Sequence, residues 1–348
     1  MHLVVLRFSA IGDVALTVPI IQKVKETYPE IQITVVSPAF LKPLFSALDV
    51  NFIDADLNGN HKGLPGIARL FSEIKKIAAP DKVIDLHGVL RTHILKRFFQ
   101  VSRIPFYSID KGREGKKALT QKNNKQWIQQ KHSSTRYADV FARAGFPIEW
   151  DTAILPTLRY HSAQAEKLWQ EIKKDARAYV GIAPLATFSG KMWPLQKVQK
   201  LIEELTAQDI QVILFGGPGD KDTLEKLVGN NPFVTSIAGR LSFDSEIALM
   251  RKINVMVSMD SSNMHLATLA GIPVVSIWGA THTLAGFGPL GDNNHLITEI
   301  PKEELSCRPC SVFGNKPCYR EDYACLNYIT TEMVLKKINM VIHPNHNA

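Results

Sequence analysis

The sequence has little that would place the protein in a membrane or outside the cell. The N-terminal stretch MHLVVLRFSAIGD holds only a short apolar run before Arg7 and Asp13. Such a run is too short for the apolar region of a signal peptide or for a spanning helix of about 20 apolar residues. With 45% hydrophobic and 21% charged residues, the 348-residue chain is not disordered and fits about two globular domains of about 150 residues. We therefore expect a folded, cytoplasmic protein.

Cysteine is also scarce. The four cysteines lie in one C-terminal segment, as Cys307, Cys310, Cys318 and Cys325. In a cytosolic chain this spacing favours a structural zinc site over disulfides. Free thiols are the alternative, because spacing alone overpredicts zinc. The Asp-x-Asp tripeptides at 54–56 and 220–222 are of a kind frequent by chance, and neither predicts a metal at an active site.

Acidic residues do not balance the basic ones in the first half of the chain. Residues 1–155 hold 22 Lys and Arg against 14 Asp and Glu, whereas 156–348 hold 19 of each, so the first half carries the whole formal net charge of +8. The tract 111–131 has seven basic residues and one acid, which predicts a positive field for an anionic partner. The alternative is a solvated linker. Trp127 is the only aromatic residue in the tract, so no nucleic-acid partner is expected.

Short apolar runs alternate with helical patterns, which is typical of parallel sheets covered on both faces. We expect an N-terminal doubly wound domain over 1–155, with strands at 3–8, 33–37, 51–54 and 82–86 and helices at 14–27 and 67–78. A second domain is expected over 156–330, with strands at 179–183, 211–215, 255–258 and 273–278. The C-terminal segment 331–348 is expected to form a helix, at 331–342, that packs back on the first domain.

The first expected strand runs directly into Ser9-Ala10-Ile11-Gly12-Asp13. Ligands of open α/β sheets bind beyond the carboxyl ends of the strands, so the residues at these positions are candidates for function. Asp13 is either the N-cap of the following helix or a carboxylate that takes a proton from an acceptor hydroxyl.

The loop after the strand at 179–183 reads Ala186-Thr187-Phe188-Ser189-Gly190-Lys191-Met192-Trp193. The hydroxyls of Thr187 and Ser189 and the charge of Lys191 suit phosphate oxygens, although the loop is not a Walker motif. The alternative is a polar turn with Trp193 packed in the core.

Two further strands end in turns with acidic or hydroxyl side chains. Phe215-Gly216-Gly217-Pro218-Gly219-Asp220 allows a nucleotide to approach the backbone, with Asp220 as a candidate for the ribose hydroxyls. Asp222 competes for that role, and surface charge explains either residue equally well. The other turn precedes a helix and predicts a diphosphate or sugar site at the helix N-terminus, formed by Asp260, Ser261, Ser262 and His265. For His265 alone, an ordinary helix position is the alternative.

Together these segments resemble the heptosyltransferase-type glycosyltransferases of family 9. The similar segments occur in the same order over nearly the whole chain: RFSAIGDVALTVP, VIDLHGVLRT at 83–92, ATFSGKMWP, MDSSNMHLA and IWGATHTLAGFGP at 277–289. The resemblance implies an α/β protein of the GT-B fold, in which two Rossmann-like doubly wound domains face a central cleft. It also implies a metal-independent, inverting enzyme that requires no cofactor.

The resemblance also implies roles for individual residues. Asp13 matches the catalytic base, Thr187 and Lys191 match donor phosphate contacts, and Asp260 and His265 match donor-site residues. Asp220 is a weaker match to an acidic nucleotide contact. This chain departs from the family in Ala186-Thr187, where Thr-Thr is common, and in Asp260-Ser261-Ser262, where Asp-Thr/Ser-Gly is usual. Both departures concern the donor pocket and therefore the donor sugar.

The expected reaction is transfer of heptose from ADP-heptose to an anionic inner-core lipopolysaccharide precursor. The candidate acceptor contacts are basic and come from the first half of the chain: Lys62, Arg91, Arg97, Lys116, Lys117 and Arg136. These charges also predict peripheral contact with the cytoplasmic face of the inner membrane. The alternatives are another nucleotide-sugar donor on the same fold, or a non-catalytic protein that binds nucleotide or nucleic acid.

Overall fold

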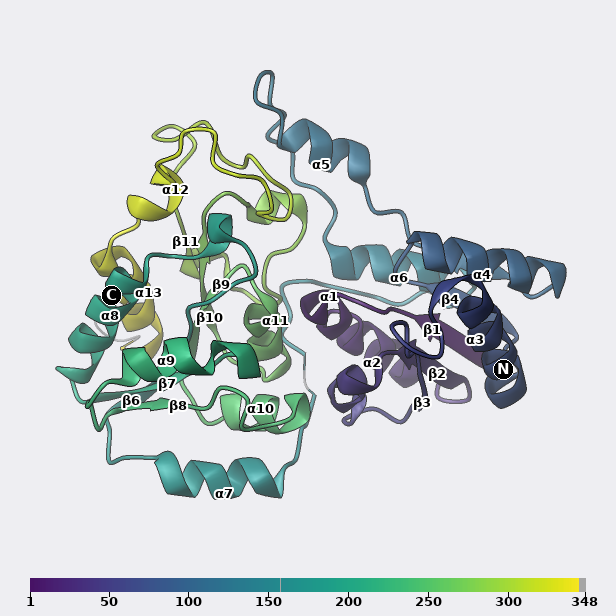
Figure 1. Ribbon diagram of the computed structural model, residues 1–348, viewed down its shortest axis with the longest axis horizontal. Helices are drawn as coiled ribbons and strands as arrows, with labels where there is room; N and C mark the ends of the chain where they lie inside the picture. The colour runs from purple at the N-terminus through teal and green to yellow at the C-terminus, as the bar shows by residue number, and fades with distance from the viewer. Residues whose placement is uncertain (157, 344–348) are drawn as a thin grey trace. The chain divides into compact units, whose positions relative to one another are not determined.

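The computed structural model describes residues 1–156 and 158–343 and divides into two compact units (Figure 1). The first unit comprises 1–111 and 131–152, and the second comprises 112–130 and the described residues from 153 onward. The division after residue 152 lies close to the boundary predicted after 155. The segment 112–130 was predicted in the first domain, and this was wrong, because the structure groups it with the second unit.

The first unit is built on a parallel sheet with strand order β3-β2-β1-β4-β5. The strands are β1 (His2–Leu6), β2 (Gln32–Ser37), β3 (Asn51–Asp54), β4 (Lys82–Asp85) and β5 (Phe106–Ser108). The helical elements are α1 (Ile11–Ala15), α2 (Val18–Thr27), the 3₁₀ helix η1 (Ala39–Phe45), α3 (Gly63–Ala78), α4 (Leu90–Val101) and α6 (Ser133–Arg143). In the central strand β1, Leu3 to Leu6 are all buried, because helices cover both faces of a parallel sheet.

Helix α3 shows why this sequence folds against the sheet. Its apolar residues recur at helical spacing, and Ile67, Leu70 and Ile74 join one buried core with Val4 and Phe99. The helix ends where Ala79 adopts a left-handed conformation, with φ of 41°, just before a proline. The carboxyl ends of β1 and β4, which hold the candidate site, are fixed by this packing.

The second unit has a six-stranded parallel sheet with order β11-β10-β9-β6-β7-β8. The strands are β6 (Ala178–Ala183), β7 (Ile210–Leu214), β8 (Val234–Ser236), β9 (Val255–Met259), β10 (Val274–Trp278) and β11 (Ile297–Glu299). The α-helices are α5 (Arg113–Leu119), α7 (Ala163–Ile172), α8 (Leu195–Thr206), α9 (Lys221–Val228), α10 (Phe243–Met250), α11 (Ser262–Leu269), α12 (Ala324–Asn327) and α13 (Thr331–Ile342). Short 3₁₀ turns complete the unit: η2 (Ser189–Lys191), η3 (Pro218–Asp220), η4 (Thr283–Ala285) and η5 (Asn294–Leu296).

The C-terminal helix α13 forms where it was predicted but packs on the other unit. It contacts α8 and the strands β9, β10 and β11, and Val334 and Ile338 are buried in the same core as Val275 and Ile277. The prediction that it packs on the first domain was therefore wrong. The physical reason is that the apolar stripe of α13 covers a face of the second sheet.

Both sheets reverse their strand order at one point. In the first unit the order reverses between β1 and β4, and in the second between β6 and β9. The loops that leave neighbouring strands at such a point diverge, and ligands of open α/β sheets bind there. None of the helices among residues 1–156 and 158–343 combines the length and the apolar character that a membrane crossing needs.

Candidate active site

Asp13 lies at the reversal point of the first sheet, just after β1. The N-cap of α1 is Ala10, so Asp13 is in the first turn of the helix and is not its N-cap. Its Oδ2 lies 2.6 Å from Nη2 of Arg7, whose side chain is buried, while the Asp13 side chain is 30% exposed. Arg7 Nη1 also donates to the carbonyl of Leu86, after β4. The site thus holds an oriented, solvent-accessible carboxylate, as proton transfer from a hydroxyl requires.

His87 follows β4 and faces the loop that carries Asp13. The backbone N–H of Phe8 donates to its Nδ1 at 3.4 Å, so the proton of the neutral ring is on Nε2, which lies 3.4 Å from Ser9 Oγ. Burial, assisted by the charge of Arg7, lowers the pKa of His87 to about 3. His87 is therefore neutral at physiological pH and orients the loop without adding charge.

Tyr137 of α6 closes the other side of this group. Its hydroxyl donates to the backbone carbonyl of Asp13 at 3.4 Å, and the guanidinium carbon of Arg7 lies 5.7 Å from the centre of its ring. Burial raises the pKa of Tyr137, so the phenol stays protonated. Sequence reasoning missed Arg7, His87 and Tyr137 because tertiary packing brings them to Asp13.

In the second unit, Lys191 and Asp260 come together at the reversal point between β6 and β9. Lys191 Nζ lies 2.9 Å from Asp260 Oδ2, and both side chains are largely buried. Lys191 ends the turn η2 after β6, and Asp260 directly follows β9. A partly buried lysine at this edge provides a positive charge for phosphate, with the N-terminus of α11 beside it.

Close backbone packing fixes the position of Lys191. The carbonyl of Gly190 accepts a hydrogen bond from the N–H of Ala280, in the loop after β10. Gly314, at φ of 75°, lies against the stem of Lys191, where a Cβ would come within 2.6 Å of Lys191 Cγ. Only glycine fits this conformation and this approach without strain.

The other predicted donor contacts lie in the loop after β6 and in the first turns of α11. Ser261 is the N-cap of α11, but its side chain makes no capping hydrogen bond and lies 3.3 Å from Ser258 Oγ. Ser262 is the first residue of α11, and His265 is buried within the helix. In the loop after β6, Thr187 is exposed, and so is Ser189, whose Oγ is 3.0 Å from the hydroxyl of Tyr323.

Two residues near the predicted donor loops have a structural role. Asp220 Oδ2 accepts from the N–H of Gly217 at 2.8 Å and so folds the glycine-rich turn η3. Because this hydrogen bond lies within the turn, it does not test the predicted contact of Asp220 with a nucleotide. That contact stays a prediction. Trp193 is buried, and its Nε1 donates to the carbonyl of Ile329, so it packs in the core. The choice between a phosphate-binding loop and a polar turn stays open.

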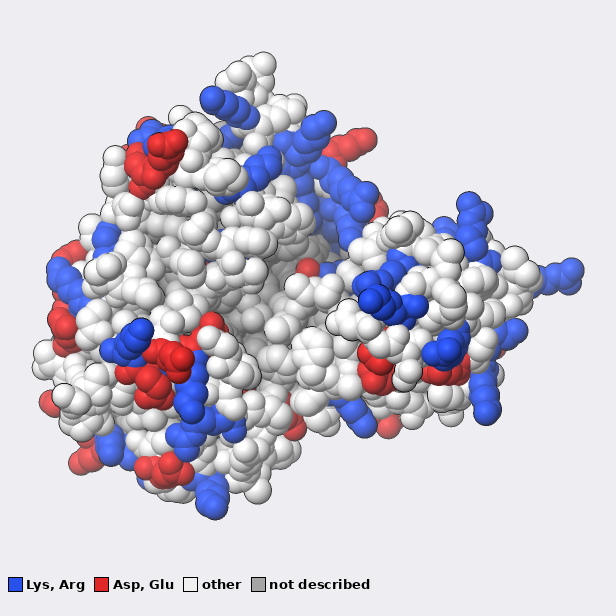
Figure 2. Space-filling model, viewed as in Figure 1, with Lys and Arg blue, Asp and Glu red and all other residues white. Residues whose placement is uncertain are grey.

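The candidate acceptor residues are divided between the units. Lys62, Arg91 and Arg97 are exposed on the first unit. Arg136 is also in that unit, where its Nη1 donates to the carbonyl of Asp110. Lys116 and Lys117 belong to α5 of the second unit, over which Figure 2 shows a group of basic side chains. Lys116 is largely buried, with Nζ 4.1 Å from the centre of the Phe287 ring. The six residues thus do not form one surface of the first domain.

The four cysteines are unpaired thiols in the structure. Within residues 1–156 and 158–343, no group of three or more His, Cys, Asp or Glu side chains is arranged to hold a metal ion. The residues that were predicted to form a zinc site, Cys307, Cys310, Cys318 and Cys325, therefore do not fit one here. Burial raises the pKa of the Cys325 thiol to about 12, so this thiol stays protonated.

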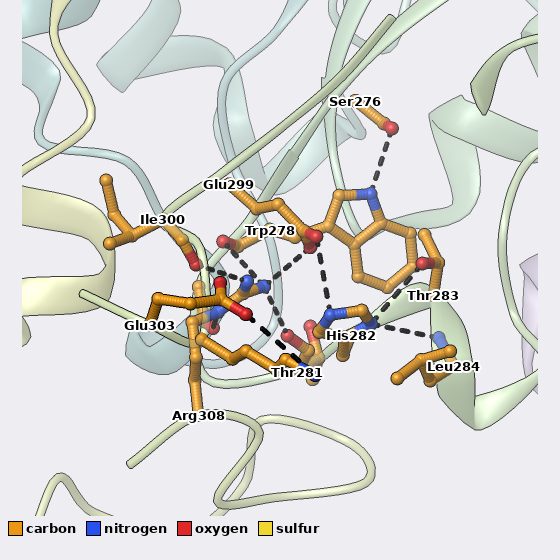
Figure 3. Close-up of polar contacts among 12 residues, drawn as sticks. Ser276, Trp278, Thr281, His282, Thr283, Leu284, Glu299, Ile300, Glu303 and Arg308 are labelled. Carbon is orange, nitrogen blue, oxygen red and sulfur yellow. Dashed lines mark hydrogen bonds and ion pairs between the residues drawn. The ribbon is translucent and has the colours of Figure 1, made fainter. Parts of the chain in front are cut away.

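Between Cys307 and Pro309 lies a residue that sequence reasoning missed, Arg308. Its guanidinium is fully buried and donates to backbone carbonyls after β10 and β11, as Figure 3 shows, and to Glu299 Oε2 at 2.9 Å. Glu299 Oε1 lies 3.3 Å from Nε2 of His282. No local sequence signal identifies this network, because its members come from three separate segments.

Two all-parallel sheets, each with a polar group at its reversal point, define a protein of two Rossmann-like α/β units. The model of glycosyltransferase family 9 (heptosyltransferase) matches residues 67–314, and the chain belongs to this family. It is therefore a glycosyltransferase of the heptosyltransferase group, whose members act in lipopolysaccharide core synthesis, and the resemblance seen in the sequence is confirmed.

Relatives of known function or structure cover nearly the full chain. Lipooligosaccharide heptosyltransferase 2 of Haemophilus influenzae is 24% identical, over 98% of this chain and 99% of its own length. The crystal structure of the glycosyl transferase family 9 protein from Veillonella parvula superposes with a TM-score of 0.77 at 20% identity, covering 99% and 98% of the two chains. Escherichia coli heptosyltransferase WaaC, solved with ADP-2-deoxy-2-fluoro heptose, gives a TM-score of 0.64 at 20% identity and 97% and 99% coverage. The last two confirm the fold class.

Proposed function

We propose that this enzyme transfers heptose from ADP-heptose to an anionic inner-core lipopolysaccharide precursor, with inversion at the anomeric carbon. The observation that carries the donor assignment is the pair of Lys191 and Asp260 beside the N-terminus of α11, at the reversal point of the second sheet. Phosphate groups bind such positions in open α/β folds. A relative of the same family has been solved with an ADP-heptose analogue, which supports this donor.

In this proposal the donor diphosphate competes with Asp260 for the charge of Lys191. Thr187, Ser189, Ser261 and Ser262 provide hydroxyl and backbone donors around the phosphate oxygens, and His265 and Asp220 stay candidate contacts to the rest of the donor. Asp260, once Lys191 turns to phosphate, is free to accept hydrogen bonds from hydroxyls of the sugar. As the glycosidic bond to phosphate breaks, Lys191 and the α11 N-terminus offset the growing negative charge without a metal.

Asp13 of the first unit is the proposed base. It takes the proton of the acceptor hydroxyl as that oxygen bonds to the anomeric carbon from the face opposite the nucleotide. The bond to the diphosphate breaks in the same step, which inverts the configuration. Arg7 fixes one oxygen of the carboxylate, and a positioned base of this kind accelerates a reaction by about 10² to 10⁴.

The basic residues support an anionic acceptor at a membrane surface. Lys62 and Arg91 are exposed beside the exposed apolar side chains of Leu64 and Leu90, at the N-terminal ends of α3 and α4. Basic groups near anionic lipid contribute about 1 kcal/mol each, and apolar side chains add to this. We therefore propose peripheral contact with the cytoplasmic face of the inner membrane.

The test is calorimetric binding of ADP, UDP and GDP to the purified enzyme, combined with an assay of heptose transfer from ADP-heptose. We expect selective binding of ADP and a loss of about 10- to 100-fold in ADP affinity in Lys191→Ala, since a hydrogen bond to a charged group contributes about 1.5 to 3 kcal/mol. Lys336→Gln, at an exposed position of α13, is the control. Preference for UDP or GDP would replace the donor, and failure to bind any of the three would reject the site.

A further inference from the structure

A pocket lies at the edge of the second sheet formed by β10 and β11, on the far side of β9 from the glycine-rich turn after β7. Its volume is about 320 Å³, at the lower end of the range of small-molecule sites. This size suits one ring of a ligand and not an extended chain. The lining includes an indole, two carboxylates, an imidazole and an ammonium group, from Trp127, Glu299, Glu303, His282 and Lys302.

The base of the pocket is rigid. The backbone N–H of Leu284 donates to Nδ1 of His282 at 3.0 Å, so the neutral ring carries its proton on Nε2, directed to Glu299. Burial lowers the pKa of His282 to about 4, which keeps the ring neutral. The other oxygen of Glu299 is held by buried Arg308, as Figure 3 shows. A fixed arrangement of this kind does not need to reorganise on binding.

The aromatic wall comes from the segment 112–130. The Trp127 indole is half-buried, and its ring centre lies 5.7 Å from that of His282 in an edge-to-face arrangement. Lys125 Nζ and Lys302 Nζ lie 5.4 and 5.7 Å from the indole centre, within the range of cation–π attraction. Lys125 also donates to the carbonyls of Cys307 and Pro309, which fixes the segment at this position.

We propose that this pocket binds one ring of an anionic saccharide, as a subsite for the acceptor. The C–H face of a sugar ring is apolar and fits the indole of Trp127. Sugar hydroxyls both donate and accept, so they match the carboxylate of Glu303. Lys302 Nζ lies 3.9 Å from Glu303 Oε1, and both side chains are exposed. A carboxylate or phosphate on the ring would take the place of Glu303 beside Lys302 and leave Glu303 to the hydroxyls. A nucleobase would stack on the indole equally well, and the ADP affinity of Trp127→Ala distinguishes the two ligands.

The pocket and the proposed donor site are separate, but the loop after β10 contributes to both. Ala280 of the loop after β10 contacts Gly190 beside Lys191, whereas His282 of the same loop lines the pocket. A ring bound here therefore does not occupy the place of the donor diphosphate. This inference rests on the proposed function, because it assigns the pocket to the acceptor of that reaction.

The experiment measures the Kd of the full-length enzyme for a de-acylated, phosphorylated inner-core saccharide, together with the KM for that saccharide, kcat and the Kd for ADP. We expect Trp127→Ala and Lys302→Gln each to raise the Kd and KM of the saccharide by about 3- to 30-fold. ADP affinity and kcat stay within about twofold. Trp127→Phe, which keeps an aromatic face, recovers most of the affinity. Tyr328→Ala and Lys336→Gln, at exposed positions of the same unit, are the matched controls.

Three outcomes would overturn the inference. Unchanged saccharide affinity in Trp127→Ala, with heptose transfer intact, rejects the pocket and leaves the proposed function standing. Loss of ADP affinity in Trp127→Ala assigns the pocket to the donor. A wild-type enzyme that transfers no heptose to the saccharide rejects both proposals. Thermal unfolding of each variant, expected to match the wild type within a few degrees, shows that the fold is retained.

Discussion

Lys191 Nζ lies 2.9 Å from Asp260 Oδ2, and these two residues follow β6 and β9, the neighbouring strands at which the second sheet reverses its order. Without a ligand, each charge is the main counterpart of the other in a largely buried place. A donor diphosphate must therefore be attracted more strongly to Lys191 than Asp260 is. Under the proposed function, the position of the Lys191 side chain accordingly controls donor affinity.

Gly314→Ala tests whether the position of the Lys191 side chain determines ADP affinity, without altering a proposed binding group. The new Cβ would meet Cγ of Lys191 at 2.6 Å, and the left-handed backbone at this position disfavours alanine. We expect ADP affinity to fall by roughly 10-fold, since part of the charge-assisted contact is lost. Gly288→Ala is the control, because its Cβ would meet only Thr283, at an ordinary 3.6 Å. Equal ADP affinities by calorimetry in the two variants would show that Lys191 is not positioned by this contact.

Asp13→Asn separates the proposed base from the rest of the site. The amide keeps the shape of the side chain but does not accept a proton, so kcat should fall by about 10² to 10⁴. ADP affinity should not change, because the proposed donor contacts lie in the other unit. The free energy of unfolding should fall by about 1 to 3 kcal/mol, since buried Arg7 loses its charged partner. Asp49→Asn, which removes an exposed ion-paired carboxylate in the same unit, should leave kcat unaltered.

Sequence patterns predicted the central strands of both sheets and the four-residue edge strand β3, and missed three others. The missed strands are β5, β8 and β11, each of three residues. All three lie at the edge of a sheet, where a strand pairs with one neighbour and needs less apolar sequence. The predicted helix at 14–27 is two helices, α1 and α2. The break lies at Thr17, whose hydroxyl bonds to the carbonyl of Val14, and proline follows at the start of α2.

Local sequence patterns likewise identified some residues of the candidate sites and missed others. Asp13, Lys191 and Asp260 could be predicted, because each directly follows a strand or its turn and the carboxyl ends of parallel strands share one edge. Arg7 and Arg308 could not, because they look like ordinary charged residues in sequence. Arg308 is 1% exposed and is stabilised by the carbonyls of Gly279 and Thr281, which only the folded chain brings to it.

Lys125→Met tests how the segment 112–130 is held. Lys125 Nζ donates to the carbonyls of Ser306, Cys307 and Pro309, and methionine keeps its length but removes these bonds. Leaving partly buried carbonyls without a donor costs about 1 to 3 kcal/mol, so this segment should open more often. We expect tryptic cleavage within 112–130 to accelerate several-fold. Lys122→Met, at an exposed position of the same segment, is the control, and an equal rate in both variants would contradict the anchoring role.

The buried imidazole of His87 makes the stability of the first unit depend on pH. Its pKa is lowered to about 3 in the folded protein, against an ordinary value of 6.5, so between these values the unfolded chain binds a proton that the folded protein does not. Stability from this group is therefore complete above pH 6.5 and falls by up to about 1.4 kcal/mol for each pH unit below it. His282, with a pKa of about 4, acts in the same direction in the second unit.

Urea unfolding at pH 7.5, 6.5 and 5.5 measures this dependence. In His87→Gln the free energy of unfolding should fall less steeply with decreasing pH than in the wild type, even though the variant is less stable at pH 7.5. His93→Gln, at an exposed position of α4, is the control and should keep the wild-type slope. If His87→Gln instead keeps the full wild-type slope, His87 is protonated in the folded protein. The conclusion that a neutral His87 ring orients the loop of Asp13 would then be wrong.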